Sequence, residues 1–473
     1  MGTELLAPLD LAFWHLESDA HPMHLGALAV FSPDAGPAPG PDALLELLGA
    51  RAAAIPRLRM RVRDVLLPVG GAAWSVDKDF DVHRHIRRVE LPGTETGGEG
   101  AFMAAATRLA GELMEQPLRR GLPPWQMYVI GGAADGPFAV LVKLHHALAD
   151  GMRAVAIGAG IFDEIASVAG RGRTGAPAGR TRPVPPRSWM PGPRQVAGLA
   201  LGRIEDLGRA FGVGASLVRA SRLDLRGATA LSASSSGTRR LATADLDLDA
   251  VQRIRRAAGG TSNDVLLAVV AGALRRWMLE RGEPLPGADP RALVPVSRRR
   301  PGGAATGNRL SAYLLGLPVS EPDPWERLRA VRGAMDRNKS AGPLRGAGAV
   351  AVLADQLPSL AHRFGAPLAG SAARMLFDVL VTSVPLPRSA LSLAGCPLRA
   401  LYPMAPLARG QSLAVALTTY GGRVQIGLVA DGKALPDLER LGRCAEEEVA
   451  ELLATLPVHG PAGGPVVRPS AAP

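Results

Sequence analysis

Apolar and polar residues alternate with two periods along this chain, and the two periods predict a mixture of strands and helices. Short apolar runs at residues 27–31, 127–130 and 138–144 are bounded by Gly, Pro or polar residues, which is typical of strands. Apolar residues at helical spacing over 43–54 and 102–114 predict helices between these strands. The first part of the chain therefore has the pattern of an α/β unit.

The same pattern returns in the second half of the chain. Alternation over residues 240–248 predicts a strand, residues 264–280 predict a long helix, and residues 292–296 predict another short strand. Residues 412–430 predict a β-hairpin, because alternating apolar positions lie on both sides of Tyr420-Gly421-Gly422. A second α/β unit thus follows the first.

A segment rich in Gly, Pro and Arg separates the two units. Residues 170–193 lack apolar periodicity and predict a linker, and residues 195–223 have the spacing of amphipathic helices. We therefore expect an N-terminal domain over 1–169, a linker with connecting helices over 170–238, a C-terminal domain over 239–457 and a disordered tail over 458–473.

Composition narrows the classes of function. The 473 residues are 47% hydrophobic and 21% charged, which is enough apolar material for more than one core. The net charge is +11, but the basic residues are spread along the chain and only 4% of residues are aromatic, so no nucleic-acid surface is predicted. Attraction to anionic lipid headgroups, or to the phosphates of a cosubstrate, fits this charge better.

The cysteines and the apolar runs indicate the cellular location that the sequence predicts. Cys396 and Cys444 have no metal-ligand spacing, so neither a disulfide framework nor a metal site is predicted, and a cytoplasmic location is expected. Residues 1–17 lack the pattern of a secretory signal, and no run of about 18 uncharged apolar residues predicts a membrane span. Association with the inner membrane face or with lipid inclusions is therefore expected to be peripheral.

The strongest candidate for chemistry is a pair of histidines at the end of a predicted strand, in the sequence FAVLVKLHHALADG. Because successive side chains of a strand point to opposite faces, His145 and His146 cannot both enter one cleft. A neutral imidazole is the usual general base near neutral pH. Two buried histidines that close a core strand are the alternative. A metal site is disfavoured, because adjacent strand histidines diverge and no third ligand has a suitable spacing.

The residues after the histidines predict a turn and a helix over 152–167. Asp150 can cap this helix or hold an ion pair, and Gly151 permits a tight turn. The sequence contains no GxSxG, HExxH, P-loop or Rossmann GxGxxG motif, so serine-nucleophile, zinc-protease, ATP and dinucleotide chemistries lack their usual signals.

With HHxxxDG at residues 145–151, the chain resembles the coenzyme A-dependent acyltransferase superfamily. Further segments resemble bacterial wax ester synthase/diacylglycerol acyltransferases: residues 6–31, 80–92, 117–125, 262–264, 294–297 and 307–308. The resemblance implies an α/β (α+β) fold with two chloramphenicol-acetyltransferase-like domains, each a mixed sheet flanked by helices. It also implies that the active site lies at the interface between the two domains.

The same resemblance implies a reaction and its residues. His146 would deprotonate an alcohol, which attacks the thioester of acyl-CoA to give wax ester or triacylglycerol and free coenzyme A, with no bound cofactor and no covalent enzyme intermediate. Asp150 would shape the loop through an ion pair, and Asn263 and Asp264 would order the site from the second domain. Trp125 would line the acyl channel.

The residues by themselves leave simpler roles open for these positions. Asn263 and Asp264 stand where a helix begins, so capping is one explanation. Trp125 beside two prolines is typical of a core or a domain seam.

Several positions depart from the family pattern and bear on substrate preference. Arg119, Pro124 and Gln126 stand where the family has Asp, Leu and Glu, and Ser383 and Leu386 stand where it has Asn and Gly. Two other functions remain open: a condensation-type enzyme that forms amides, and a lipid-binding protein on a decayed acyltransferase scaffold. These motifs do not set acyl-chain length, acceptor alcohol or oligomeric state.

Overall fold

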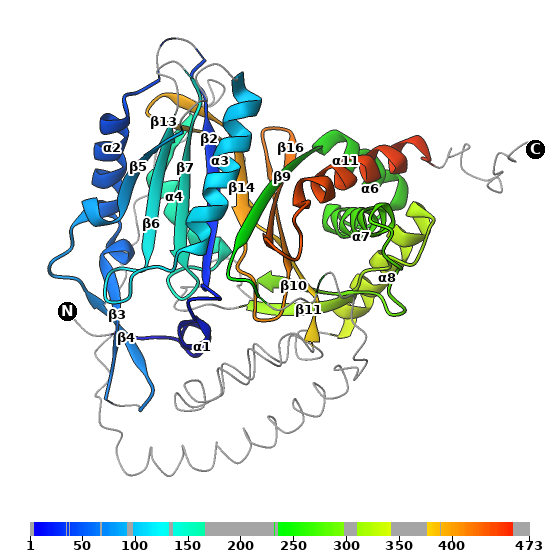
Figure 1. Cartoon of the computed structure of the whole chain (residues 1–473), viewed down its shortest axis with the longest axis horizontal. Helices are drawn as coiled ribbons and strands as arrows, with labels where there is room; N and C mark the ends of the chain where they lie inside the picture. The colour runs from blue at the N-terminus through cyan, green and yellow to red at the C-terminus, as the bar shows by residue number, and fades with distance from the viewer. Residues whose placement is uncertain are drawn as a thin grey trace, which may run out of the picture.

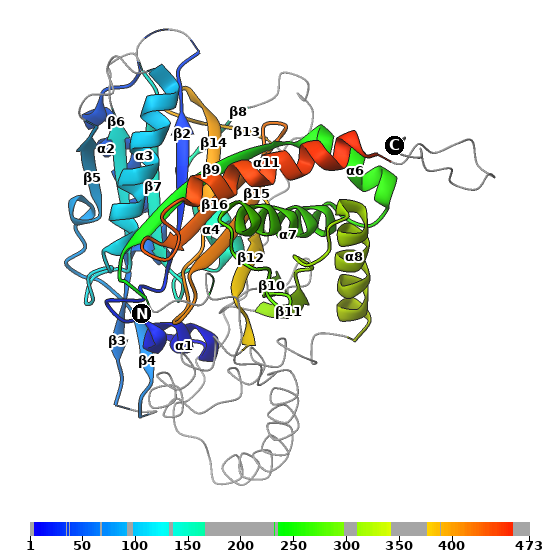
Figure 2. The same cartoon turned by 45° about the vertical axis from the view of Figure 1, so that its right-hand side comes forward.

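The structure is a computed structural model with two large sheets side by side (Figures 1 and 2). It describes residues 4–34, 36, 38–66, 69–91, 98–131, 136–165, 231, 235–297, 310–341, 376–387 and 389–456. The predicted linker at 170–193, the predicted helices at 195–223, the Gly-Asn pair at 307–308 and the tail at 458–473 lie outside the described residues.

The first sheet has seven strands in the order β5-β6-β7-β2-β14-β13-β8. Alternate residues of its strands face opposite layers: Ala29 and Phe31 pack towards helices α2 and α4, whereas Leu28 and Val30 pack towards α3. The strands predicted at 27–31, 127–130 and 138–144 and the helices predicted at 43–54 and 102–114 are confirmed. The elements are β2 (His24–Phe31), α2 (Pro41–Ala54), β5 (Ile86–Glu90), α3 (Gly98–Glu115), β6 (Trp125–Gly131), β7 (Phe138–His145), α4 (Gly151–Ile161), β8 (Asp163–Ile165), β13 (Ala390–Leu393) and β14 (Cys396–Met404).

The second sheet has six strands in the order β11-β10-β12-β15-β16-β9. It is mixed, because β10, β12 and β15 run parallel while the other neighbours are antiparallel. The predicted hairpin is confirmed, with Tyr420 opposite Arg423. The elements are β9 (Arg239–Asp247), α6 (Leu248–Ala258), α7 (Ser262–Glu280), β10 (Arg291–Ser297), β11 (Leu310–Gly316), α8 (Pro324–Ala341), β12 (Val379–Ser383), β15 (Leu413–Tyr420), β16 (Arg423–Asp431) and α11 (Leu438–Ala454).

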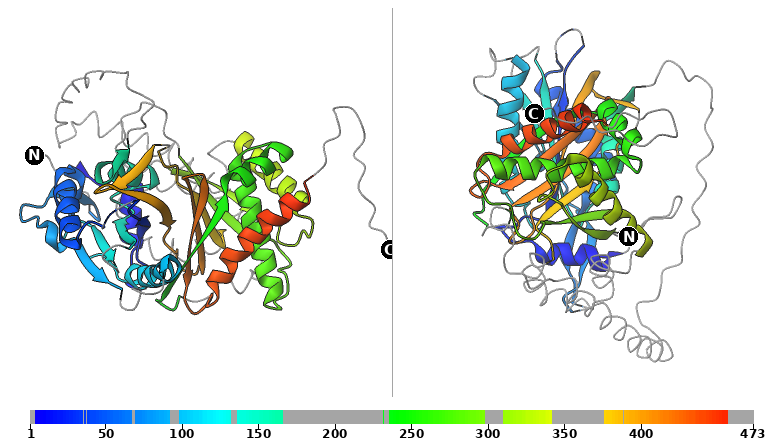
Figure 3. Two further views of the ribbon diagram at one scale, coloured as in Figure 1. Left: turned by 90° about the horizontal axis from the view of Figure 1, so that it is seen from above. Right: turned by 90° about the vertical axis from the view of Figure 1, so that its right-hand side faces the viewer.

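Strands β13 and β14 come from the second half of the chain but belong to the first sheet. Figure 3 shows β14 between the two halves of the molecule. At Gly427 of β16 the backbone of β14 comes so close that an added Cβ would lie 1.9 Å from the Pro403 carbonyl oxygen. The sheets therefore divide the chain differently from the expected bounds 1–169 and 239–457, since residues 390–404 join the N-terminal unit.

A small sheet and a short helix, which the pattern did not predict, complete the N-terminal unit. The sheet has the order β1-β4-β3. Helix α4 also ends at Ile161 rather than at residue 167, because the chain turns into strand β8 at Asp163. The added elements are β1 (Glu4–Leu5), α1 (Pro8–Leu16), η1 (Pro56–Arg59), β3 (Met60–Asp64), β4 (Ala72–Val76) and η2 (Val82–Arg84).

Within the described parts of the chain, no single helix is both long and apolar enough to cross a membrane. The bent pair α6 and α7 reaches the necessary length and composition only when its two helices are taken together.

Candidate functional site

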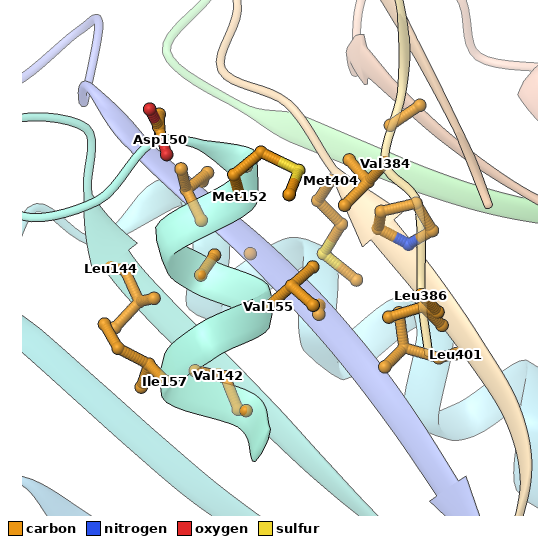
Figure 4. Close-up of a pocket in the computed structure, with 18 of the residues that line it drawn as sticks. Val142, Leu144, Asp150, Met152, Val155, Ile157, Val384, Leu386, Leu401 and Met404 are labelled. Carbon is orange, nitrogen blue, oxygen red and sulfur yellow. The ribbon is translucent and has the colours of Figure 1, made fainter. Parts of the chain in front are cut away.

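A cavity of about 280 Å³ lies between α4 and the two large sheets. Its walls come from β2, β7 and β14 of the first sheet, from β12 and β15 of the second, and from residues 384–387 (Figure 4). Among the described residues that line it, the polar side chains are His146, Asp150, Thr382 and Ser383. The remaining lining is apolar, with Val155 of α4 facing Leu386 and Leu401 in Figure 4, so the cavity suits an apolar ligand with a reaction at one end.

His146 directly follows strand β7 and lines this cavity. Its backbone N–H donates to the Met23 carbonyl over 2.8 Å, and its ring stacks on Phe13 with centroids 3.9 Å apart and planes 19° from parallel. Burial lowers the pKa of His146 to about 4, which outweighs the opposite effect of Asp150. The imidazole is therefore neutral near neutral pH and can accept a proton.

His145 points away from the cavity and is fully buried, as the alternation of strand side chains requires. Its Nδ1 accepts the Ala147 N–H over 3.0 Å, and its Nε2 lies 3.5 Å from Oε1 of Glu17. The Trp14 ring meets the His145 ring edge-on at 5.1 Å. Thus one histidine faces the cavity and the other faces a set of residues behind it.

Three residues contact the histidine pair but were not predicted to be part of the site: Phe13, Trp14 and Glu17. They lie in or next to α1, within the segment 6–31 that resembles the acyltransferase family. Periodicity does not reveal them, because they act through side-chain contacts with residues about 130 positions away. The family resemblance of that segment was the available signal.

Asp150 and Gly151 stand at the start of α4. Asp150 is 2% exposed, caps the helix through Oδ1, which accepts the Arg153 N–H over 2.8 Å, and lines the cavity. The helix cap, one of the two roles open for Asp150, is thus present. Gly151 is the first residue of α4 and is not among the glycines with positive φ, so its backbone conformation does not require glycine. It lies instead against Val384, which an added Cβ would meet at 3.6 Å.

Trp125 is fully buried in the core beside the histidine turn and is not part of the cavity wall. Its Nε1 donates to the Leu58 carbonyl over 2.6 Å, and its ring stacks on His85 at 4.5 Å. The neighbouring Pro124 carbonyl accepts the His145 N–H over 3.0 Å. The backbone next to Trp125 thus orders the end of β7. The Trp125 ring lies in the core and not in the cavity wall, where the resemblance placed it.

Asn263 and Asp264 begin helix α7 and do not line the described cavity. Asp264 is 1% exposed and forms a capping box with Thr261, in which Oδ2 accepts the Thr261 N–H over 2.8 Å. Lys339 of α8 lies 3.8 Å from its Oδ1. The capping explanation therefore accounts for the geometry of Asp264.

The departures from the family pattern fall into two groups. Ser383 and Leu386 line the cavity, where they can influence the choice of substrate. Arg119 is exposed, while Pro124 and Gln126 are buried, with Gln126 Oε1 accepting the Tyr128 hydroxyl over 2.7 Å.

In the described part of the chain, one group of potential metal ligands lies together: Glu280, Cys444 and Glu447. Arg440 already pairs with both carboxylates, including a 2.6 Å bond from Nε to Glu280 Oε2. Burial raises the pKa of Cys444 to about 12, which disfavours the thiolate that binds metals. The three residues do not line the cavity, and the ion pairs with Arg440 explain why the two carboxylates lie together.

Comparison with known proteins identifies relatives over nearly the whole chain. The model of the wax ester synthase/diacylglycerol acyltransferase catalytic domain matches residues 6–266, and that of the WS/DGAT C-terminal domain matches residues 306–453. The Mycobacterium tuberculosis protein named "Probable diacyglycerol O-acyltransferase tgs1" is 32% identical over 454 residues, which cover 95% of this chain and 96% of that protein.

Two solved structures are similar in fold. The wax ester synthase/diacylglycerol acyltransferase from Marinobacter aquaeolei VT8 has a TM-score of 0.67 at 24% identity and covers 96% of this chain and 99% of its own. A variant starter condensation domain of rhizomide synthetase, in complex with C8-CoA and Leu-SNAC, has a TM-score of 0.56 at 17% identity and covers 96% and 94%. The expected two-domain fold of mixed sheets flanked by helices is confirmed.

Proposed function

We propose that this chain, which belongs to the wax ester synthase/diacylglycerol acyltransferase family, transfers a long-chain acyl group from acyl-CoA to the hydroxyl of diacylglycerol or of a long-chain alcohol. Family membership makes the chain an acyl-CoA-dependent acyltransferase, and coenzyme A is accordingly a co-substrate. The observation that carries the proposal is a neutral histidine, His146, on the wall of an apolar cavity between the two sheets.

In this reaction His146 is the general base. It accepts the proton of the acceptor hydroxyl while the oxygen attacks the thioester carbonyl and a tetrahedral oxyanion forms. The carbon–sulfur bond then breaks, and the thiolate of coenzyme A takes the proton from the imidazolium.

The composition of the cavity supports lipid substrates. Its side chains are apolar along α4 and β14, so an acyl chain or an alkyl alcohol gains free energy by leaving water there. Asp150 supports the site by capping α4, whose first turn carries Met152 beside the cavity. Thr382 and Ser383 supply hydroxyl groups in the same lining.

The test is an assay of the purified full-length chain with long-chain acyl-CoA and, separately, diacylglycerol and a long-chain alcohol. Free thiol and ester product are measured together. Ester and thiol should appear in equal amounts and only with an acceptor present. Thiol release without ester indicates hydrolysis and contradicts the proposal. Amide formation with amine acceptors alone supports the condensation-type alternative.

The protein is also proposed to meet its substrates at a lipid surface, as a peripheral protein. The β3–β4 hairpin projects from the body at the lower left of Figure 1. Leu66 is 92% exposed and Val69 is 52% exposed at its end, and Leu5 of the same small sheet is 53% exposed. Arg59, just before β3, and Arg63, within β3, are also exposed, and the net charge of +11 favours anionic headgroups.

Vesicle flotation tests this attachment. Leu66→Asp should lower the fraction bound to anionic vesicles about tenfold, because a charge replaces a leucine that inserts among lipids. Leu279→Asp is the matched control, since Leu279 is 50% exposed on α7 of the other domain. An equal loss in both variants, or no binding by the wild-type protein, contradicts the proposed surface.

A further inference from the structure

Glu17 is a buried carboxylate that lies behind the histidine pair rather than in the cavity. Its side chain is 5% exposed, directly after the end of α1. Oε1 lies 3.5 Å from Nε2 of His145 and accepts the Met23 N–H over 3.4 Å, and Oε2 lies 3.4 Å from Arg120. Burial raises the pKa of Glu17, but His145, Arg120 and the Met23 amide together lower it by more. The carboxylate is therefore ionised at neutral pH.

His145 organises the turn that carries His146. Its Nδ1 accepts the Ala147 N–H over 3.0 Å, and its carbonyl accepts the Leu148 N–H over 2.8 Å. Because Nδ1 accepts a hydrogen bond, the proton of a neutral His145 ring belongs on Nε2. That nitrogen is the one that faces Glu17, so an anionic oxygen lies where it stabilises this tautomer.

Glu17 also reaches His146 from its other side. Met23 donates its N–H to Glu17, and the Met23 carbonyl accepts the N–H of His146 over 2.8 Å. Arg120 fixes the carboxylate in turn, since its guanidinium lies 4.7 Å from the centre of the Trp14 ring. Glu17 thus contacts both His145, the residue before His146, and Met23, whose carbonyl binds the His146 backbone.

We infer that Glu17 is a positioning residue for the reaction, which sets the tautomer and orientation of His145 and through them the place of the His146 ring in the cavity. The inference rests on the proposed role of His146 as the base. A displacement of about 1 Å of a reacting group can lower a rate about 100-fold, so a contact made behind the site can control turnover. Glu17 itself does not line the cavity.

The first test is Glu17→Gln in the full-length protein, a change that removes the charge and keeps the shape. We expect kcat to fall about 10- to 100-fold while KM for long-chain acyl-CoA changes less than about twofold, because the cavity wall is unaltered. Glu46→Gln is the matched control, since Glu46 is exposed on α2. An unchanged kcat in Glu17→Gln, or an equal fall in the control, overturns the inference.

A double-mutant cycle tests whether Glu17 acts through His145. His145→Asn keeps an acceptor for the Ala147 N–H but removes the nitrogen that faces Glu17. If Glu17 acts through this ring, adding Glu17→Gln to His145→Asn lowers kcat no further. Losses that multiply in the double variant overturn the inference.

The tautomer gives a readout that a role in stability alone does not move. Nitrogen-15 NMR of the histidine rings should show the Nε2–H form of His145 in the wild-type protein and a changed Nε2–H signal in Glu17→Gln, because this nitrogen loses its anionic neighbour. An identical His145 signal in both proteins overturns the inference, and this measurement needs no turnover. The proposed function fails separately, if His146→Ala retains full activity.

Discussion

Helices α4 and α7 are both capped with the help of a buried aspartate but have different surroundings. Each has a buried aspartate in its first turn or just before it, 2% exposed at Asp150 and 1% exposed at Asp264, and each carboxylate accepts a backbone N–H. The start of α4 lines the cavity, whereas α7 is packed into the core of the second domain. The comparison teaches that a capping aspartate follows from local chemistry, while its relation to the site depends on the neighbouring sheets.

The largest expected effect concerns the histidine that precedes α4. His146→Ala should lower kcat/KM about 10²- to 10⁴-fold, because the proton of the alcohol then has no general base. The melting temperature is measured as well, because loss of the ring also removes its stacking contact with Phe13. Steady-state kinetics with long-chain acyl-CoA measure the change, and the exposed His83→Ala is the control. Similar kcat/KM values for the two variants would show that the part of the cavity beside His146 is not the reaction site.

The next effect concerns the face of α4 that lines the cavity. Gly158 lies in this lining, and an added Cβ meets only ordinary contacts with Phe162, at 3.9 Å, so the backbone accommodates a Cβ at this position. Gly158→Leu should shift the preference from long to short acyl-CoA about tenfold, because its side chain occupies space that the acyl chain would fill. Ala156→Leu, exposed on α4 outside the lining, should leave the preference unchanged.

A smaller effect separates the two aspartates themselves. Asp150→Ala and Asp264→Ala should each lower the free energy of unfolding by about 1 kcal/mol, because each removes a helix cap. Urea unfolding measures these losses. The fall in kcat/KM should be larger for Asp150→Ala, since only Asp150 lines the cavity. An equal or larger fall in the Asp264 variant would contradict the comparison.

The smallest effect is the response to pH above the pKa of His146. Burial lowers that pKa to about 4, so the base stays unprotonated until the pH falls towards that value. Between pH 8 and 6, kcat/KM should fall less than about twofold, whereas a histidine of ordinary pKa would lose about fourfold. A pH–rate profile measures this, and an acid limb near pH 6.5 would contradict a buried, neutral base.

Much of the fold was predictable from local patterns. The hairpin at 412–430 and the long helix that begins near Asp264 follow from alternation and from helical spacing. Helix α1 was not predicted, and α4 was predicted too long, because β8 pairs with β13 from the far end of the chain. Pairing between such distant segments leaves no periodic signal near either of them.

The sequence by itself determined that His145 and His146 point to opposite sides, because a strand alternates its side chains. It also determined that an aspartate stands at the start of α4 and of α7. The family resemblance already named His146 as the base, and only the tertiary structure decided that His145 meets Glu17 behind the cavity. It also decided that β14 crosses to the first sheet and closes the cavity against α4. The physical reason is that local geometry sets directions, whereas the packing of distant segments sets what lies in those directions.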